Sequence, residues 1–85
     1  MNKILVIDDD EAVNELVKIN LELAGYNVIS ARDGISGFAA AKQEQPDLII
    51  LDVMMPDVDG YTVAKRIREN PEIKDTPIIM LTALG

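Results

Sequence analysis

Apolar residues fall into two patterns that alternate along this chain. Short continuous apolar runs, such as residues 4–7 and 48–51, are typical of strands buried on both faces of a parallel sheet. Between these runs, apolar residues recur every three or four positions, which is the spacing of a helix that covers one face of a sheet. The runs predict strands at residues 3–7, 48–52 and 78–82, and the β-branched Val28 and Ile29 predict a second, shorter strand at 26–30.

The segments between the runs predict three helices. Asp10 can cap the N-terminus of the first helix, and Gly25 can end it in a left-handed conformation. The second helix is expected at residues 35–44, and the third is expected to run from about Tyr61 to a point before Pro71. The apolar stripe of the first helix comprises Val13, Leu16, Val17, Leu21 and Ala24.

Strands and helices therefore alternate in the order βαβαβαβ. This order predicts an α/β fold with a parallel sheet and right-handed crossovers. A chain of 85 residues suffices for one small domain, so we assign residues 1–85 to a single domain. Because 48% of the residues are hydrophobic, this domain can form a buried core.

Acidic residues follow two of the apolar runs directly. Asp8, Asp9 and Asp10 follow the first run, and Asp52 ends the third. In open parallel sheets, ligands bind beyond the carboxyl ends of the strands, so Asp8, Asp9 and Asp52 are expected to meet there. Carboxylates that close cannot all stay ionised without a cation. Their oxygen atoms predict a hard divalent ion such as Mg²⁺.

A simpler interpretation exists for several of these acids. Asp8, Asp9 and Asp10 could form a solvated helix start, since acids favour helix N-termini. Asp52 at the end of a second strand makes the metal site the preferred hypothesis. Asp57 is interpreted as a solvated loop acid rather than a ligand, and the Asp-Gly pair at 59–60 as turn and cap chemistry.

Composition narrows the function classes further. The chain contains no cysteine and no histidine, which argues against a disulfide scaffold and removes the usual general base. The formal charge of -7 would repel phosphate backbones, so direct nucleic-acid binding is not expected. No apolar run approaches membrane-spanning length and no secretory signal pattern is present, so we expect a soluble cytoplasmic protein.

Three segments together resemble the receiver domain of two-component response regulators. They are residues 3–10 (KILVIDDD), residues 52–60 (DVMMPDVDG) and residues 81–83 (LTA), in the order and at the spacing of that family. The resemblance covers the whole chain. It implies a flavodoxin-like sheet with strand order 2-1-3-4, an order that comes from the family and not from the residue pattern.

The resemblance also implies roles for individual residues. Asp52 is similar to the phosphoacceptor, which takes a phosphoryl group from the phosphohistidine of a sensor histidine kinase. Asp9 resembles a direct Mg²⁺ ligand, Asp8 a ligand that acts through water, and Met54 a ligand through its backbone carbonyl. Thr82 resembles the switch hydroxyl that bonds a phosphoryl oxygen after transfer.

The chain departs from the family after its fourth strand. Receivers continue with a fourth helix, a fifth strand ending in a lysine that contacts the phosphoryl oxygens, and a fifth helix. No residue here matches that lysine, so we expect a truncated receiver with impaired phosphoryl transfer. Apolar surface on strands 48–52 and 78–82 would also be open. This predicts a homodimer, formed through the edge of the last strand or through the uncovered sheet face.

Three functions are therefore compared. The leading hypothesis is a phosphoacceptor signalling module that is not itself an enzyme. The alternative is an excised or engineered receiver fragment that folds by homodimerisation and has only a structural role. A phosphatase that forms an aspartyl-phosphate is the weakest hypothesis, because such enzymes commonly need a second Asp where this chain has Met54.

Overall fold

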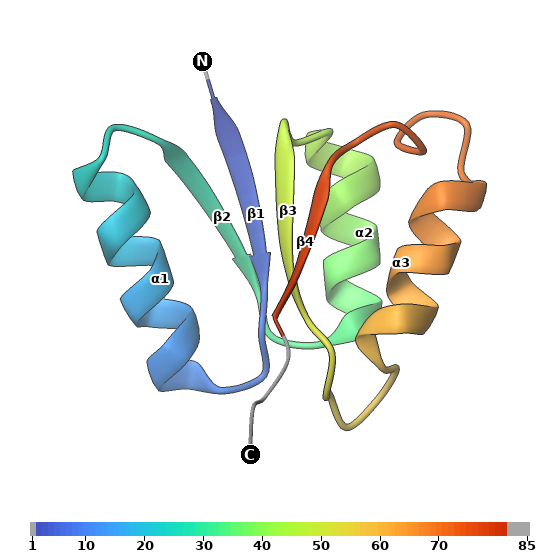
Figure 1. Cartoon of the computed structure of the whole chain (residues 1–85), viewed down its shortest axis with the longest axis horizontal. Coiled ribbons are helices and arrows are strands. Elements are labelled where there is room, and N and C mark those ends of the chain that lie inside the picture. Colours follow the sequence, from blue (N-terminus) through green and yellow to red (C-terminus); the bar gives the residue numbers. More distant parts are fainter. Residues whose placement is uncertain (1, 82–85) are drawn as a thin grey trace.

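In the computed structural model, residues 2–81 are described and form a four-stranded sheet flanked by three helices (Figure 1). The strands pair in parallel in the order β2-β1-β3-β4, so the predicted order is confirmed. The elements are β1 (Lys3–Ile7), α1 (Glu11–Leu23), β2 (Asn27–Ala31), α2 (Gly34–Glu44), β3 (Leu48–Asp52), α3 (Gly60–Glu69) and β4 (Ile78–Leu81).

The helices form two layers, one on each face of the sheet. Helix α1 lies on one face, whereas α2 and α3 lie side by side on the other (Figure 1). The face under α2 and α3 holds the main core. Its fully buried members include Leu5, Ile7, Ile49, Leu51, Val63, Ile67 and Ile73.

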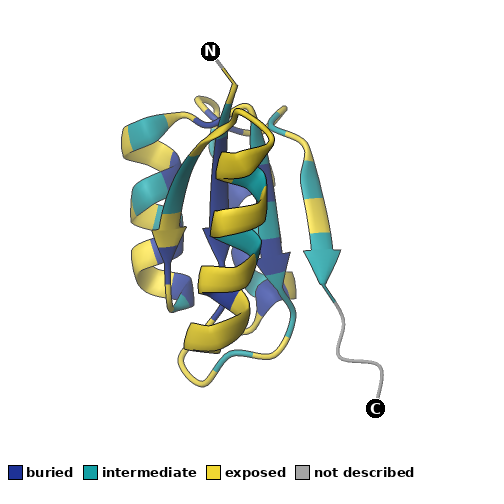
Figure 2. Ribbon diagram, turned by 90° about the vertical axis from the view of Figure 1, so that its left-hand side faces the viewer, coloured by how far each residue is buried: buried dark blue, intermediate teal, exposed yellow. Residues whose placement is uncertain are grey.

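The opposite face is covered only in part. Helix α1 packs on β1 and β2, and the β1 side chains of Ile4 and Val6 are buried there. At β4, Ile79 is 50% exposed, and on α1 Leu16 is 61% exposed. Figure 2 views the molecule from the side of α1 and shows most of this helix in the colour of exposed residues. The predicted apolar stripe of α1 is therefore only partly covered.

Side-chain caps begin the helices where the sequence predicts them. The Asp10 carboxylate accepts hydrogen bonds from the amides of Ala12 and Val13 at the start of α1. Asp59 accepts the amide of Thr62 at the start of α3, which confirms cap chemistry for the Asp-Gly pair.

Strand β2 begins and ends one residue later than predicted, and the C-terminus of α1 explains the shift at its start. Gly25 has a φ of 98°, as expected for a left-handed helix end. Its amide donates to the carbonyl of Glu22, and the amide of Tyr26 donates to that of Leu21, which is the Schellman pattern. Tyr26 therefore belongs to this turn, so β2 spans Asn27–Ala31 instead of 26–30. Both α2 and α3 begin one residue earlier than predicted.

Two further predictions concern membrane-spanning segments and the end of the fourth strand. No helix among residues 2–81 is long and apolar enough to cross a membrane. The predicted last residue of the fourth strand, Thr82, lies outside the described residues.

The unequal cover of the two faces predicts unequal effects of the same substitution. Leu5→Ala would open a cavity in the main core, because Leu5 is 0% exposed, and should lower the free energy of unfolding by about 2–5 kcal/mol. Leu23→Ala, at an 82% exposed position of α1, should change it by no more than about 0.5 kcal/mol. Urea denaturation followed by circular dichroism measures both. Equal losses would contradict the proposed position of the core.

Candidate functional site

Three carboxylates meet beyond the carboxyl ends of β1 and β3. Oxygen atoms of Asp8, Asp9 and Asp52 all lie within 4.8 Å of one another. The cause is strand pairing: β1 and β3 are parallel neighbours, and Ile7 is opposite Leu51, so the residues that follow both strands share one edge. The structure thus brings together the three carboxylates that the sequence predicted to converge.

Asp8 is buried and held by several hydrogen bonds. Its amide donates to the carbonyl of Ala31 at 3.1 Å, and its carboxylate accepts the amide of Asp10 at 2.9 Å. The Asn14 side chain adds two bonds, because Nδ2 donates to the carbonyls of Asp8 and Ala31, each at 3.0 Å. These bonds fix the backbone from which Asp8 and Asp9 project.

Asn14 is a supporting residue that the sequence analysis missed. It is buried on α1, next to the apolar position Val13. A buried amide needs partners, and here it joins α1 to the ends of β1 and β2. The available signal was an Asn immediately beside the apolar stripe, four residues after the helix cap.

Asp52 carries the electrostatic strain of the site. Burial raises the pKa of Asp52, and the nearby Asp8 and Asp9 raise it further, while the Met54 amide lowers it by donating to the carboxylate at 3.3 Å. The charged form of Asp52 is thus disfavoured by its surroundings. A positive charge beside the three carboxylates would favour the charged form of Asp52.

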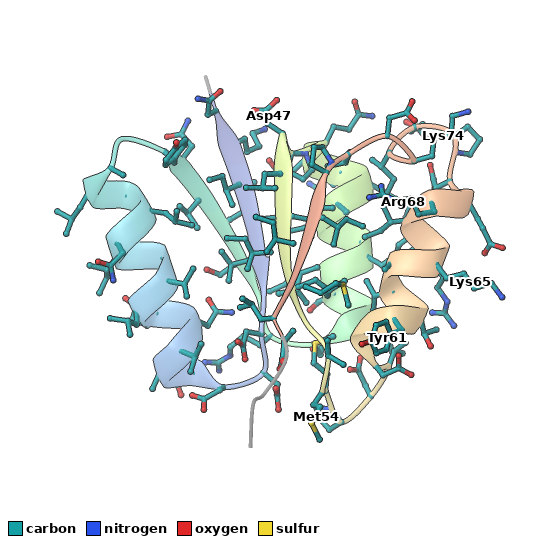
Figure 3. The ribbon with its side chains drawn as sticks, in the orientation of Figure 1. Asp47, Met54, Tyr61, Lys65, Arg68 and Lys74 are labelled. Carbon is teal, nitrogen blue, oxygen red and sulfur yellow. The ribbon has the colours of Figure 1, made fainter. Side chains whose placement is uncertain are left out.

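No side chain among residues 2–81 supplies that charge. The ion pairs in this part of the chain are Lys3 with Glu44 and Arg32 with Glu11, and neither involves the three carboxylates. Figure 3 shows Lys65 pointing outward from α3, away from the strand ends. A cation with oxygen preference fits the donor set, as the sequence predicted for Mg²⁺.

An open pocket of about 430 Å³ adjoins the carboxylates. Its lining combines four acidic residues with three apolar ones. A second hollow of about 480 Å³ lies next to it and shares Asp9 and Met54. The first pocket is lined by Asp8, Asp9, Asp10, Val13, Asp52, Met54 and Leu81.

The loop between β3 and α3 brings Met54 to this pocket. Met54 is exposed, and Figure 3 shows it near the end of the molecule where the strands finish. Gly60 closes the loop, since its amide donates to the carbonyl of Val53 at 2.8 Å. A Cβ at Gly60 would overlap the backbone carbonyl of Asp52, so only glycine allows this close approach.

Two further residues from the sequence analysis are Thr82 and Asp57. Thr82, the predicted switch hydroxyl, lies outside the described residues. Asp57 is exposed, as a loop acid should be, but its carboxylate accepts the amides of Gly34 and Ile35 at 2.9 and 3.0 Å. The sequence analysis did not predict this link between the β3–α3 loop and α2.

Helix α3 carries three basic residues, Lys65, Arg66 and Arg68, whose surroundings differ. Lys65 and Arg66 are exposed to solvent. Arg68 has a structural role, because Nη1 donates to the carbonyls of Lys74 and Thr76 at 2.8 and 2.6 Å. It thereby closes the connection from α3 to β4 (Figure 3).

Comparison with known proteins identifies the family. Residues 4–85 match the model of the response regulator receiver domain, so this chain belongs to that family. Over 85 residues it is 59% identical to the DNA-binding dual master transcriptional regulator RpaA of Synechocystis, covering all of this chain and 35% of RpaA. It is 49% identical over 81 residues to the PhoP regulatory protein of alkaline phosphatase synthesis in Bacillus subtilis, covering 95% of this chain and 33% of PhoP.

Solved structures agree with this assignment. The N-terminal domain of a response regulator receiver protein from Methanoculleus marisnigri superposes with a TM-score of 0.94 at 37% identity, covering 98% of this chain and 68% of that one. The response regulator TrrA of Thermotoga maritima, solved in complex with Mg²⁺-BeF, gives 0.92 at 39% identity, covering 100% and 72%.

These coverages set the scope of the assignment. The chain spans about a third of the length of the curated relatives that it matches. DNA binding is a property given to RpaA as a whole, and it does not test whether this acidic domain binds nucleic acid. The comparisons give no support to the alternative of a purely structural fragment.

The strained carboxylate predicts that Asp52→Asn stabilises the metal-free protein. At pH 7 the free energy of unfolding should rise by about 1 kcal/mol, because two like charges 4 Å apart repel by about that amount even in water. The pKa of Asp52 is raised in the fold, so the folded state holds this proton more tightly than the unfolded state. The advantage should therefore vanish near pH 3, below the usual aspartate pKa of about 3.9, and appear as the pH rises through the folded pKa.

Urea denaturation in the presence of a chelator, repeated across this pH range, measures the effect. Asp47→Asn is the matched control, because Asp47 lies at the opposite edge of the sheet (Figure 3). A metal-free Asp52→Asn protein that is less stable than wild type at pH 7 would contradict the electrostatic interpretation.

Proposed function

We propose that this chain is the phosphoacceptor module of a two-component signalling system and that Asp52 is its phosphorylation site. The observation that carries the proposal is the convergence of Asp8, Asp9 and Asp52, with no ion pair to neutralise them among residues 2–81. Membership in the receiver family supports it. The proposed phosphodonor is the phosphohistidine of a sensor histidine kinase.

Asp52 acts as the nucleophile in this proposal. One of its carboxylate oxygens attacks the phosphorus atom and forms an O–P bond, while the bond to the donor breaks and the donor leaves with the electron pair. The product is an acyl phosphate on Asp52. The pocket of about 430 Å³ beside Asp52 accommodates the incoming group.

The other residues of the site would hold the cation. Asp9 directly, Asp8 through water, Asp52 and the backbone carbonyl of Met54 would hold Mg²⁺ at the strand ends. When bound, Mg²⁺ offsets the negative charge that the carboxylate and the phosphoryl oxygens bring together. Asp8 is positioned for its part by the amide of Asp10 and by Asn14. The hydroxyl of Thr82 is proposed to bond a phosphoryl oxygen after transfer.

This function is signalling rather than catalysis on a substrate. The domain changes its own charge once per event, and the new charge and acceptor oxygens would bias neighbouring segments. In the 85-residue chain, phosphorylation should be slow, because no lysine among residues 2–81 lies at the site. The cytoplasmic location and the absence of direct nucleic-acid binding stay predictions.

Incubation with Mg²⁺ and acetyl phosphate, followed by intact mass measurement, tests the proposal. We expect an increment of one phosphoryl group in the wild type and in Asp47→Asn, and none in Asp52→Asn. Calorimetric titration with Mg²⁺ alone separates binding from transfer. A wild-type protein that neither binds Mg²⁺ nor gains mass would refute the proposed function.

A second proposal concerns the association of the 85-residue chain with itself. We infer that it forms a twofold dimer through the face that α1 leaves open. Ile79 of β4 is half exposed there, and Val13 and Leu16 of α1 are exposed on the same side. Strand β4 is also an edge of the described sheet, so its free backbone groups can pair with a second copy.

Size-exclusion chromatography with light scattering tests this dimer. The wild type should elute as a dimer at micromolar concentration, and Ile79→Lys should be monomeric because a charge would then lie in the contact. Ile35→Lys is the matched control, since Ile35 is 63% exposed but lies on α2, on the other side of the sheet, and should stay dimeric. A wild-type monomer would rule out this association.

A further inference from the structure

Asp57 joins two loops that are far apart in the sequence. It belongs to the β3–α3 loop, yet its Oδ1 accepts the amide of Gly34 at 2.9 Å and its Oδ2 accepts the amide of Ile35 at 3.0 Å. Both amides lie in the first turn of α2, where helix amides have no partner within the helix. The contact therefore uses both carboxylate oxygens and spans more than 20 residues of sequence.

Helix α2 already has its own cap. The Asp33 carboxylate accepts the amide of Ser36 at 2.7 Å, which is the ordinary N-cap bond. The two aspartates thus bond different amides of the same turn. Because Asp33 alone can begin the helix, the second carboxylate has a distinct consequence: it fixes the loop to the helix.

Packing confirms that the loop sits closely on α2. A Cβ at Gly34 would come within 2.9 Å of the carbonyl oxygen of Val58, the neighbour of Asp57. Helix α2 is itself held against β1, because a Cβ at Gly37 would meet the side chain of Ile7 at 2.7 Å. Ile7 directly precedes Asp8. The loop that follows β3 is therefore anchored to an element packed on β1, the strand that carries the other two carboxylates.

The loop is anchored at both ends as well. At its start the Val53 amide donates to the carbonyl of Leu81, and at its end Asp59 caps α3 through the Thr62 amide. Met54 follows Val53 directly, is exposed, and donates its amide to the Asp52 carboxylate at 3.3 Å. Asp57 adds two hydrogen bonds to α2 from the middle of this loop, beside the packing of Val58 on Gly34.

We propose that Asp57 is a positioning residue, which holds the β3–α3 loop on α2 and thereby sets the backbone of Met54 for divalent-cation binding. The inference rests on the proposed function for its cation. The loop geometry that it predicts does not depend on the cation. The amides of Gly34 and Ile35 also lower the pKa of Asp57, as expected for a carboxylate bonded in its charged form.

Three variants test the proposal. Asp57→Ala removes both bonds to α2, Asp57→Asn keeps one acceptor oxygen, and Asp33→Ala is the matched control. Asp33→Ala removes one negative charge and one cap from the same helix end, but it leaves the loop anchored. The two readouts are the Kd for Mg²⁺ by calorimetry and amide hydrogen exchange of residues 53–56 in the metal-free protein.

We expect Asp57→Ala to weaken Mg²⁺ binding about ten-fold, which is typical of the loss of an outer partner of a metal site. Exchange of residues 53–56 should become faster in the same variant, and Asp57→Asn should lie between it and the wild type. Asp33→Ala should lower the Tm while leaving the Kd and the loop exchange as in the wild type.

Two results would overturn the proposal. One is an Asp57→Ala protein with wild-type affinity and wild-type loop exchange. The other is an equal loss in Asp33→Ala, which would show that only helix stability or overall charge matters. If the wild type binds no Mg²⁺, the proposed function fails, and loop exchange then decides alone: faster exchange in Asp57→Ala only would support the positioning role, and no change would refute it.

Discussion

The parallel pairing of β1 with β3 is the constraint on which the site depends. Side-by-side parallel strands end at the same edge, so the register that places Ile7 opposite Leu51 also places Asp8 beside Asp52. The apolar core that fixes this register therefore forces like charges together. Burial and the neighbouring carboxylates raise the pKa of Asp52, and either a proton or a cation would relieve the repulsion. Core packing therefore determines, through strand register, how closely the three carboxylates approach one another.

The elements of the fold could be predicted because each has a local signal. Three strands were predicted from continuous apolar runs and the second from its β-branched residues, and Asp10, Asp59 and Gly25 mark helix ends through contacts within a few residues. Tyr26 shows where this reasoning stops: as a strand former it reads as part of β2, but its amide is used by the end of α1. Bounds depend on which neighbour takes each backbone group, which composition does not reveal.

The carboxylates of the site could be predicted, whereas their supports could not. Asp8, Asp9 and Asp52 end apolar runs, and the topology of parallel sheets brings such ends together. Asn14 and Asp57 act on partners 17 to 23 residues away, across elements whose relative placement only the folded chain defines. Nothing local distinguishes Asp57 from an ordinary solvated acid. Supporting residues of this kind become visible only when the loops are seen packed against each other.

The two faces of the sheet differ in how far their apolar residues are covered. The α2–α3 face is closed by its own helices, and it carries the anchor for the β3–α3 loop through Gly34 and Gly37. The α1 face leaves Ile79 and Leu16 exposed, so apolar area there is available to another surface. Val13 of α1 and Leu81 of β4 line the same pocket as Asp52. A surface that covered Val13 and Leu81 would adjoin this pocket, and a change of charge at Asp52 would alter the electrostatic environment of that contact.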